Sequence, residues 1–170
     1  YMRHGEQLGM RWDYAFYQMV VETGGLSYKN GNRSGSVKPQ QNNFAGIGAA
    51  GGGESGESFA DVSSGVKAHL QHVLLYAGEK IEQPVAERTR KVQEWGVLTS
   101  WQKSVKGPIT FQELSGRWAN SKGYGAQIES VAERFNNEHC QKPDPEPQLL
   151  AKAKGQTGVA KAAPAAAPPI

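Results

Sequence analysis

The chain has 170 residues, enough for one domain with a buried core, and its formal net charge is +3. Four lysines against two acids in residues 141–170 account for +2 of that charge, so no basic cluster for nucleic acid is expected in the rest. The single cysteine, Cys140, excludes an internal disulfide, and no apolar run reaches the roughly 20 residues of a membrane span.

Residues 1–10 are polar and punctuated by glycine, which predicts a lead-in turn. Residues 11–23 form the first predicted helix, because apolar side chains recur there at three- and four-residue spacing. These side chains are Trp12, Ala15, Phe16, Met19 and Val20. The pair Gly24-Gly25 ends the helix.

Glu22 lies at the end of this apolar run. Burial would raise the pKa of its carboxyl, and a carboxyl that keeps its proton near neutral pH can act as a general acid. We interpret Glu22 as such an acid. The alternative is a surface acid at a helix end, a position that the helix dipole slightly disfavours.

The stretch from Gly24 to Gly65 holds 11 of the 21 glycines, which predicts turns, short strands or a small β-lobe. Its segment 46–51 matches the dinucleotide pattern G-x-G-x-x-G, but further glycines follow where that motif needs a helix, so we reject it. Asn42 and Asn43 offer amide groups for sugar hydroxyls and N-acetyl groups, or else they only form turns.

The rest of the chain is predicted to be mainly helical up to residue 137. Helices are expected over 62–77 with Asp61 as N-cap, over 84–95, over 110–118 behind a Thr110–Glu113 capping box, and over 121–137, with a loop or short strand at 96–109. The sum is a mostly helical α+β domain over residues 1–138. Residues 139–170, rich in Pro, Ala and Lys, are predicted to be a disordered tail or linker.

Four stretches of the chain follow one another in a recognisable order. They are Gln18–Gly24 (QMVVETG), Asn42–Ile47 (NNFAGI), Glu57–Phe59 (ESF), and Trp118-Ala119 with Gly123–Gly125. In this order they resemble the bacterial glucosaminidases of glycoside hydrolase family 73, which include autolysins and flagellum-associated wall hydrolases. The resemblance runs from about residue 11 to about residue 136.

This resemblance implies a lysozyme-like helical domain, with a small Gly-rich β-lobe or loop region beside a cleft. It implies cleavage of the β-1,4 bond after N-acetylglucosamine in peptidoglycan, without metal or cofactor. The family's catalytic glutamate falls on Glu22, and the residues implied to hold the glycan fall on Asn42, Asn43, Phe44, Gly46 and Tyr124. For Phe44 and Tyr124, burial in the core is the alternative interpretation.

The implied partner is the peptidoglycan strand, and the implied location is the periplasm, the cell wall or the secreted fraction. No signal peptide is visible after Tyr1, so we expect a processed or excised piece. The positive tail could hold a protein partner or an anionic polymer.

Glycoside hydrolysis normally needs a second group at the anomeric carbon. Glu57 is the first candidate, Glu54 the second, and the sugar's own 2-acetamido group the third; Asp61 is more simply a helix cap. The β-lobe, where relatives often carry this acid, is shortened here to the Gly-rich residues 51–57. The alternative function is therefore a non-catalytic peptidoglycan-binding or assembly module.

For two other patterns we favour a packing role over a role in binding. His69 and His72, three residues apart on one predicted helix, could bind a metal, but a packed pair is the simpler interpretation. Trp95, Trp101 and Trp118 could line a carbohydrate groove, but tryptophans at helix ends usually pack in a core.

Overall fold

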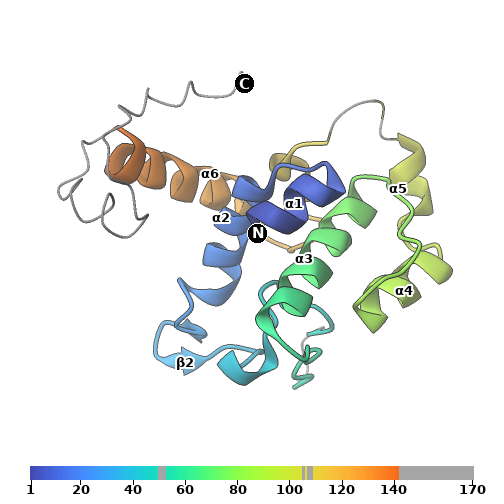
Figure 1. Ribbon diagram of the computed structural model, residues 1–170, viewed down its shortest axis with the longest axis horizontal. Helices are drawn as coiled ribbons and strands as arrows, with labels where there is room; N and C mark the ends of the chain where they lie inside the picture. Colours follow the sequence, from blue (N-terminus) through green and yellow to red (C-terminus); the bar gives the residue numbers. More distant parts are fainter. Residues whose placement is uncertain (50–52, 105, 107–108, 142–170) are drawn as a thin grey trace, which may run out of the picture. The chain divides into compact units, whose positions relative to one another are not determined.

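A computed structural model describes residues 1–49, 53–104, 106 and 109–141 (Figure 1). Within these ranges the protein is mostly helical, and its strands form one short hairpin. The helices are α1 (Met2–Leu8), α2 (Trp12–Thr23), α3 (Val62–Tyr76), α4 (Glu87–Glu94), α5 (Thr99–Ser104) and α6 (Tyr124–Phe135). The chain divides into two units, residues 1–134 and 135–170, and the second is described up to residue 141.

Helix α2 begins and ends as its sequence predicts. Gly24 adopts the left-handed conformation at φ 57° and closes the helix, and its N–H donates to the carbonyl groups of Val20 and Val21. One face of α2 packs on α3 and on the Gly-rich middle of the chain. The buried cluster there consists of Ala15, Met19, Phe44, Val66 and Leu70.

The prediction of a turn over residues 1–10 is wrong, because Met2–Leu8 forms α1, which contacts α2 and α3 (Figure 1). Its buried Gly5 lies so close to α2 that an added Cβ would come within 2.3 Å of Trp12 Cβ. Leu8 and Met10 then pack against the buried cluster. Tertiary packing therefore stabilises a helix that has little apolar periodicity of its own.

The Gly-rich middle contains one antiparallel hairpin of β1 (Lys29–Asn30) and β2 (Arg33–Ser34), followed by the 3₁₀ turn η1 (Pro39–Gln41). Phe44, Ala45 and Ile47 are buried, so the loop after η1 is anchored in the core. Loops and a minimal hairpin thus occupy the described part of the predicted β-lobe.

Helix α3 carries the core of the first unit. Asp61 accepts a hydrogen bond from Ser64 N at 2.7 Å, which confirms the predicted N-cap. The helix passes so close to the preceding loop that a Cβ on Gly65 would lie 1.8 Å from the carbonyl oxygen of Asn42. Glycine at this position therefore lets α3 lie against the Asn42 turn.

Three predictions for residues 84–109 are wrong. Helix α4 begins at Glu87 and not at Pro84, and Trp95 is 61% exposed although we expected it to face inward. Residues 99–104 form α5 where a loop or strand was predicted, and Trp101 Nε1 in that helix donates to Tyr76 O at 2.8 Å. That anchor on α3 is a long-range contact, which local sequence signals do not report.

The predicted capping box is confirmed: Thr110 N donates to Glu113 Oε2 at 2.7 Å. The turn it begins is the 3₁₀ helix η2 (Phe111–Leu114), which ends four residues before the predicted end at Trp118. Helix α6 follows, and its Tyr124 and Ile128 are buried with Leu114.

In the second unit, Asn136–Cys140 forms the π-helical turn η3, and the rings of Phe135 and His139 lie 4.9 Å apart. Cys140 is exposed. The predicted boundary after residue 138 falls in this turn, and most of the predicted tail, residues 142–170, lies outside the described residues. Across the described ranges, no helix combines the length and apolar character that a bilayer crossing requires.

Candidate active site

Glu22 lies in the last turn of α2, and two side chains from the C-terminal third of the chain donate hydrogen bonds to it. The Tyr124 hydroxyl donates to Oε1 at 2.5 Å, and Trp118 Nε1 donates to the same oxygen at 3.0 Å. The residue as a whole is partly buried. The structure therefore brings Glu22 together with Tyr124, 102 residues away along the chain.

The surroundings of this carboxyl favour its protonated form. Burial raises the pKa of Glu22, and the hydrogen bonds from Tyr124 and Trp118 oppose that rise without cancelling it. Burial also raises the pKa of Tyr124, as does the charge of Glu22, so the phenol keeps its proton and remains a donor. A carboxyl with a raised pKa beside a neutral donor has the character of a general acid.

The other oxygen of Glu22, Oε2, faces the loop after η1. A Cβ added to Gly46 would lie 3.6 Å from Oε2, and Gly46 has φ +62°, which side-chain-bearing residues rarely adopt. Among the described residues, both hydrogen bonds that reach Glu22 end on Oε1. Since two donors already occupy Oε1, the acid proton belongs on Oε2, beside Gly46.

Trp118 is held over this site by aromatic rings on α3. Its ring centroid lies 5.1 Å from that of His72, 5.3 Å from that of Tyr76 and 5.9 Å from that of His69. These contacts fix the indole so that its N–H points at Glu22. The sequence favours a packing role for Trp118 and carries no local signal for this donor bond.

Asn42 and Asn43 use their amides within the loop. Asn43 is 0% exposed; its Nδ2 donates to Ile47 O at 2.9 Å, and its Oδ1 accepts from Ile47 N at 3.0 Å. Asn42 Nδ2 donates to Phe59 O at 3.1 Å. Phe44 is buried in the core between α2 and α3. These residues therefore shape the loop that carries Gly46.

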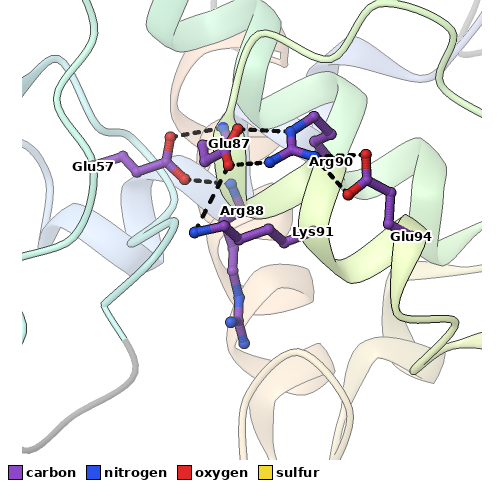
Figure 2. A network of polar contacts seen from close by, with 6 residues as sticks. All are labelled: Glu57, Glu87, Arg88, Arg90, Lys91 and Glu94. Carbon is purple, nitrogen blue, oxygen red and sulfur yellow. Dashed lines mark hydrogen bonds and ion pairs between the residues drawn. The ribbon is translucent and has the colours of Figure 1, made fainter.

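Glu57 is bonded to the start of α4. Its Oε2 accepts from Glu87 N at 2.9 Å and its Oε1 accepts from Arg88 N at 2.6 Å, as Figure 2 shows. Ala86, at the N-cap position, supplies no side-chain bond, so Glu57 takes over the capping from a distant segment. Beyond it, Arg90 pairs with Glu87 and Glu94 on the exposed face of α4 (Figure 2).

Glu57 also touches the loop that Glu22 faces. A Cβ on Gly48 would lie 3.3 Å from Glu57 Cγ, two residues along from Gly46. Glu54, the other candidate for the second group, is exposed. Both predicted second acids thus stay candidates, but the two oxygens of Glu57 are each engaged by a backbone N–H.

His69 and His72 are both buried on α3. His72 Nδ1 lies 2.8 Å from Thr89 Oγ1, and His69 is bonded to Tyr1 and to Gln18. Burial lowers the pKa of His69 to about 3 and that of His72 to about 4. In the described part of the chain, no group of three or more His, Cys, Asp or Glu side chains could hold a metal ion.

A pocket of about 480 Å³ lies between the end of α1, helix α3 and the loop 79–83. Its lining includes Lys67, Gln71 and Leu74, and none of the predicted site residues. We place the candidate site at Glu22 because a carboxyl with a raised pKa and its two side-chain donors converge there.

Comparisons with known proteins add one relative. The chain is similar to an uncharacterized protein of Borreliella burgdorferi, with 32% identity over 123 residues, which is 72% of this chain and 53% of the relative. The chain therefore spans about half the length of that relative. No family model matches the chain, and no solved structure matches it.

Proposed function

We propose that this protein is a peptidoglycan hydrolase of glucosaminidase type, a member of glycoside hydrolase family 73 with a lysozyme-like arrangement of helices. It cleaves the β-1,4 bond after N-acetylglucosamine, and Glu22 protonates the glycosidic oxygen. The observation that carries this proposal is the state of Glu22: burial raises its pKa while two donors occupy only one of its oxygens.

The direction of approach follows from the same geometry. A glycan laid along the Gly46 loop would meet Oε2 of Glu22, the oxygen that holds the transferable proton. Gly46 matters here because any side chain would occupy the space between the loop and that oxygen. Tyr124 donates to Oε1 and stabilises the carboxylate that remains after proton transfer.

The second step, attack at the anomeric carbon, has three candidate groups. Glu57 is held at the start of α4 by two backbone donors, which makes it the least available of the three. This favours the substrate's 2-acetamido group, or Glu54 from the exposed loop, as the group that acts there. The substrate places the protein in the periplasm, at the cell wall or outside the cell.

A non-catalytic wall-binding or assembly module is the second candidate. It is favoured by the engagement of Glu57 as a helix cap, because a site without a second acid can bind glycan without turning it over.

Release of reducing ends from purified peptidoglycan separates the two functions. The hydrolase releases them and its Glu22→Gln variant does not, since the amide cannot donate an acidic proton. Unchanged release by Glu22→Gln would remove Glu22 from its role. Saturable binding to the wall without any release, by the unmodified protein, would favour the module.

A further inference from the structure

A row of hydrogen-bonded side chains leads from Tyr1 to Glu22 through the interior. Tyr1 Oη lies 2.8 Å from His69 Nδ1, and His69 Nε2 lies 3.0 Å from Gln18 Oε1. Gln18 Nε2 donates to the Tyr124 hydroxyl at 2.8 Å, and Tyr124 donates to Glu22 at 2.5 Å. Three elements, α2, α3 and α6, contribute to this row.

With the Gln18 amide oxygen facing His69, the chemistry of each group gives the direction of every bond. An amide oxygen only accepts, so the His69 proton lies on Nε2, which donates to Gln18 Oε1. Burial lowers the pKa of His69 to about 3, so its ring is neutral and its Nδ1 accepts from the Tyr1 hydroxyl. The Tyr124 oxygen accepts from Gln18, which leaves its single proton for Glu22.

Water does not disturb this order, since Gln18 and His69 are 0% exposed and Tyr124 is 3% exposed. If the Gln18 amide were turned over, its oxygen would draw the Tyr124 proton away from Glu22. His69 with its proton on Nε2 opposes this, because Nε2–H then needs Gln18 Oε1 as its acceptor.

We propose that Gln18, His69 and Tyr1 are positioning residues. They keep the Tyr124 hydroxyl proton pointed at Oε1 of Glu22, and thereby leave Oε2 to carry the acid proton. The proposal rests on the proposed role of Glu22 as the general acid. None of the three touches the substrate side of the site; each acts through Tyr124. Donation along the row, from Tyr1 to His69, to Gln18 and then to Tyr124, polarises the Tyr124 hydroxyl and strengthens its bond to the ionised form of Glu22.

Other titratable groups surround this row and are left unchanged by the test. Tyr76 raises the pKa of Tyr124, and Tyr28 raises that of Tyr1. His72 lowers the pKa of His69, and Arg88 lowers those of His72 and Tyr76.

The test uses Gln18→Met, which removes two bonds at similar volume, and Tyr1→Phe, which removes one hydroxyl. Thr89→Val is the matched control, because it removes a buried hydroxyl bonded to the other histidine, His72, whose ring packs on Trp118 but which is not a member of the row. The ionisation of Glu22 is followed by NMR of ¹³C-labelled glutamate carboxyls, and Glu22→Gln assigns its signal.

We expect the pH midpoint of Glu22 ionisation to rise in Gln18→Met, to rise less in Tyr1→Phe, and to stay unchanged in Thr89→Val. With peptidoglycan, kcat of Gln18→Met should fall roughly five- to tenfold with little change in KM, the size expected from one hydrogen bond. If Gln18→Met fails to fold, as circular dichroism would reveal, Tyr1→Phe carries the test alone.

A Glu22 midpoint that stays in place in every folded variant of the row overturns the proposal, whether or not the protein cleaves peptidoglycan. A midpoint that moves as expected in a protein without turnover supports the positioning role and contradicts the proposed hydrolase instead. The two failures are therefore distinguishable.

Discussion

Two glutamates border the same turn of the Gly-rich middle, and they are held in opposite ways. Glu22, beside Gly46, is bonded through one oxygen by the side chains of Tyr124 and Trp118. Glu57, beside Gly48, is bonded through both oxygens by the backbone at the start of α4. Backbone donors at a helix start hold a carboxylate as part of the fold, whereas side-chain donors on one oxygen leave the other for chemistry.

The strongest test of this contrast between Glu22 and Glu57 is to make the same substitution at both positions. We expect Glu22→Gln to lower the release of reducing ends at least about 100-fold, the usual contribution of a general acid. Glu57→Gln should lower it less than about tenfold, because it disturbs a helix start and not the proton donor. An equally large loss in both variants would make Glu57 a second catalytic group and end the contrast.

The Tyr124 hydroxyl should have the next largest effect. Its bond lowers the pKa of Glu22, so Tyr124→Phe should raise that pKa and move the high-pH limb of the pH–rate profile to higher pH. The rate should fall roughly 10- to 100-fold, since the lost bond is to a charged group. Tyr14→Phe is the control, because Tyr14 also donates from one helix to a carboxylate on another, Glu129, at 3.2 Å.

A high-pH limb that stays in place or moves to lower pH in Tyr124→Phe would show that Tyr124 does not stabilise the carboxylate. A similar loss in Tyr14→Phe would mean that both variants merely loosen the packing of α2 on α6.

Removal of the Glu57 cap should affect stability and leave the chemistry largely intact. Glu57→Ala should cost about 1 kcal/mol, as the loss of a helix cap does, and lower Tm by roughly 2–4 °C. Glu54→Ala, at an exposed position three residues earlier, should leave Tm unchanged. A Tm that is the same in both variants would contradict the capping role of Glu57.

The smallest expected effect is a pH-dependent difference in stability at Glu22. Because folding raises its pKa above the ordinary 4.5, the ionised form destabilises the folded state as pH rises through the raised value. Glu22→Gln removes this loss, so its Tm should exceed that of the unmodified protein by about 2 °C at pH 7, with no difference near pH 4.

His69 and His72 destabilise the fold as pH falls below 6.5, but they do so equally in both proteins and cancel from the comparison. A Tm difference that is constant with pH would contradict the raised pKa of Glu22.

Local signals in the sequence predicted the parts of the fold that depend on neighbours along the chain. The stop at Gly24, the Asp61 cap and the Thr110–Glu113 box each need contacts across only a few residues, and all are confirmed. The start of α4 was misplaced because its cap, Glu57, lies 30 residues upstream of Glu87. Helices α1 and α5 were missed for the same reason, since their anchors are long-range.

The candidate site divides in a similar way. Glu22 and Tyr124 were singled out from the sequence, and the structure places them in contact. Three-dimensional packing determines the donor role of Trp118 and the roles of Gln18 and His69. No spacing in the sequence predicts these roles. The polar side chains of Asn42 and Asn43 suggested sugar contacts, yet the backbone of their own loop uses these amides.

The central claim, that Glu22 donates a proton to a glycosidic bond in peptidoglycan, is tested most directly by identifying the ends it creates. Purified peptidoglycan is digested, the new reducing ends are reduced with borohydride, and the terminal sugars are identified by mass spectrometry. The account predicts reduced N-acetylglucosamine from the unmodified protein and none from Glu22→Gln. Reduced N-acetylmuramic acid, or the absence of any new end with the unmodified protein, would contradict it.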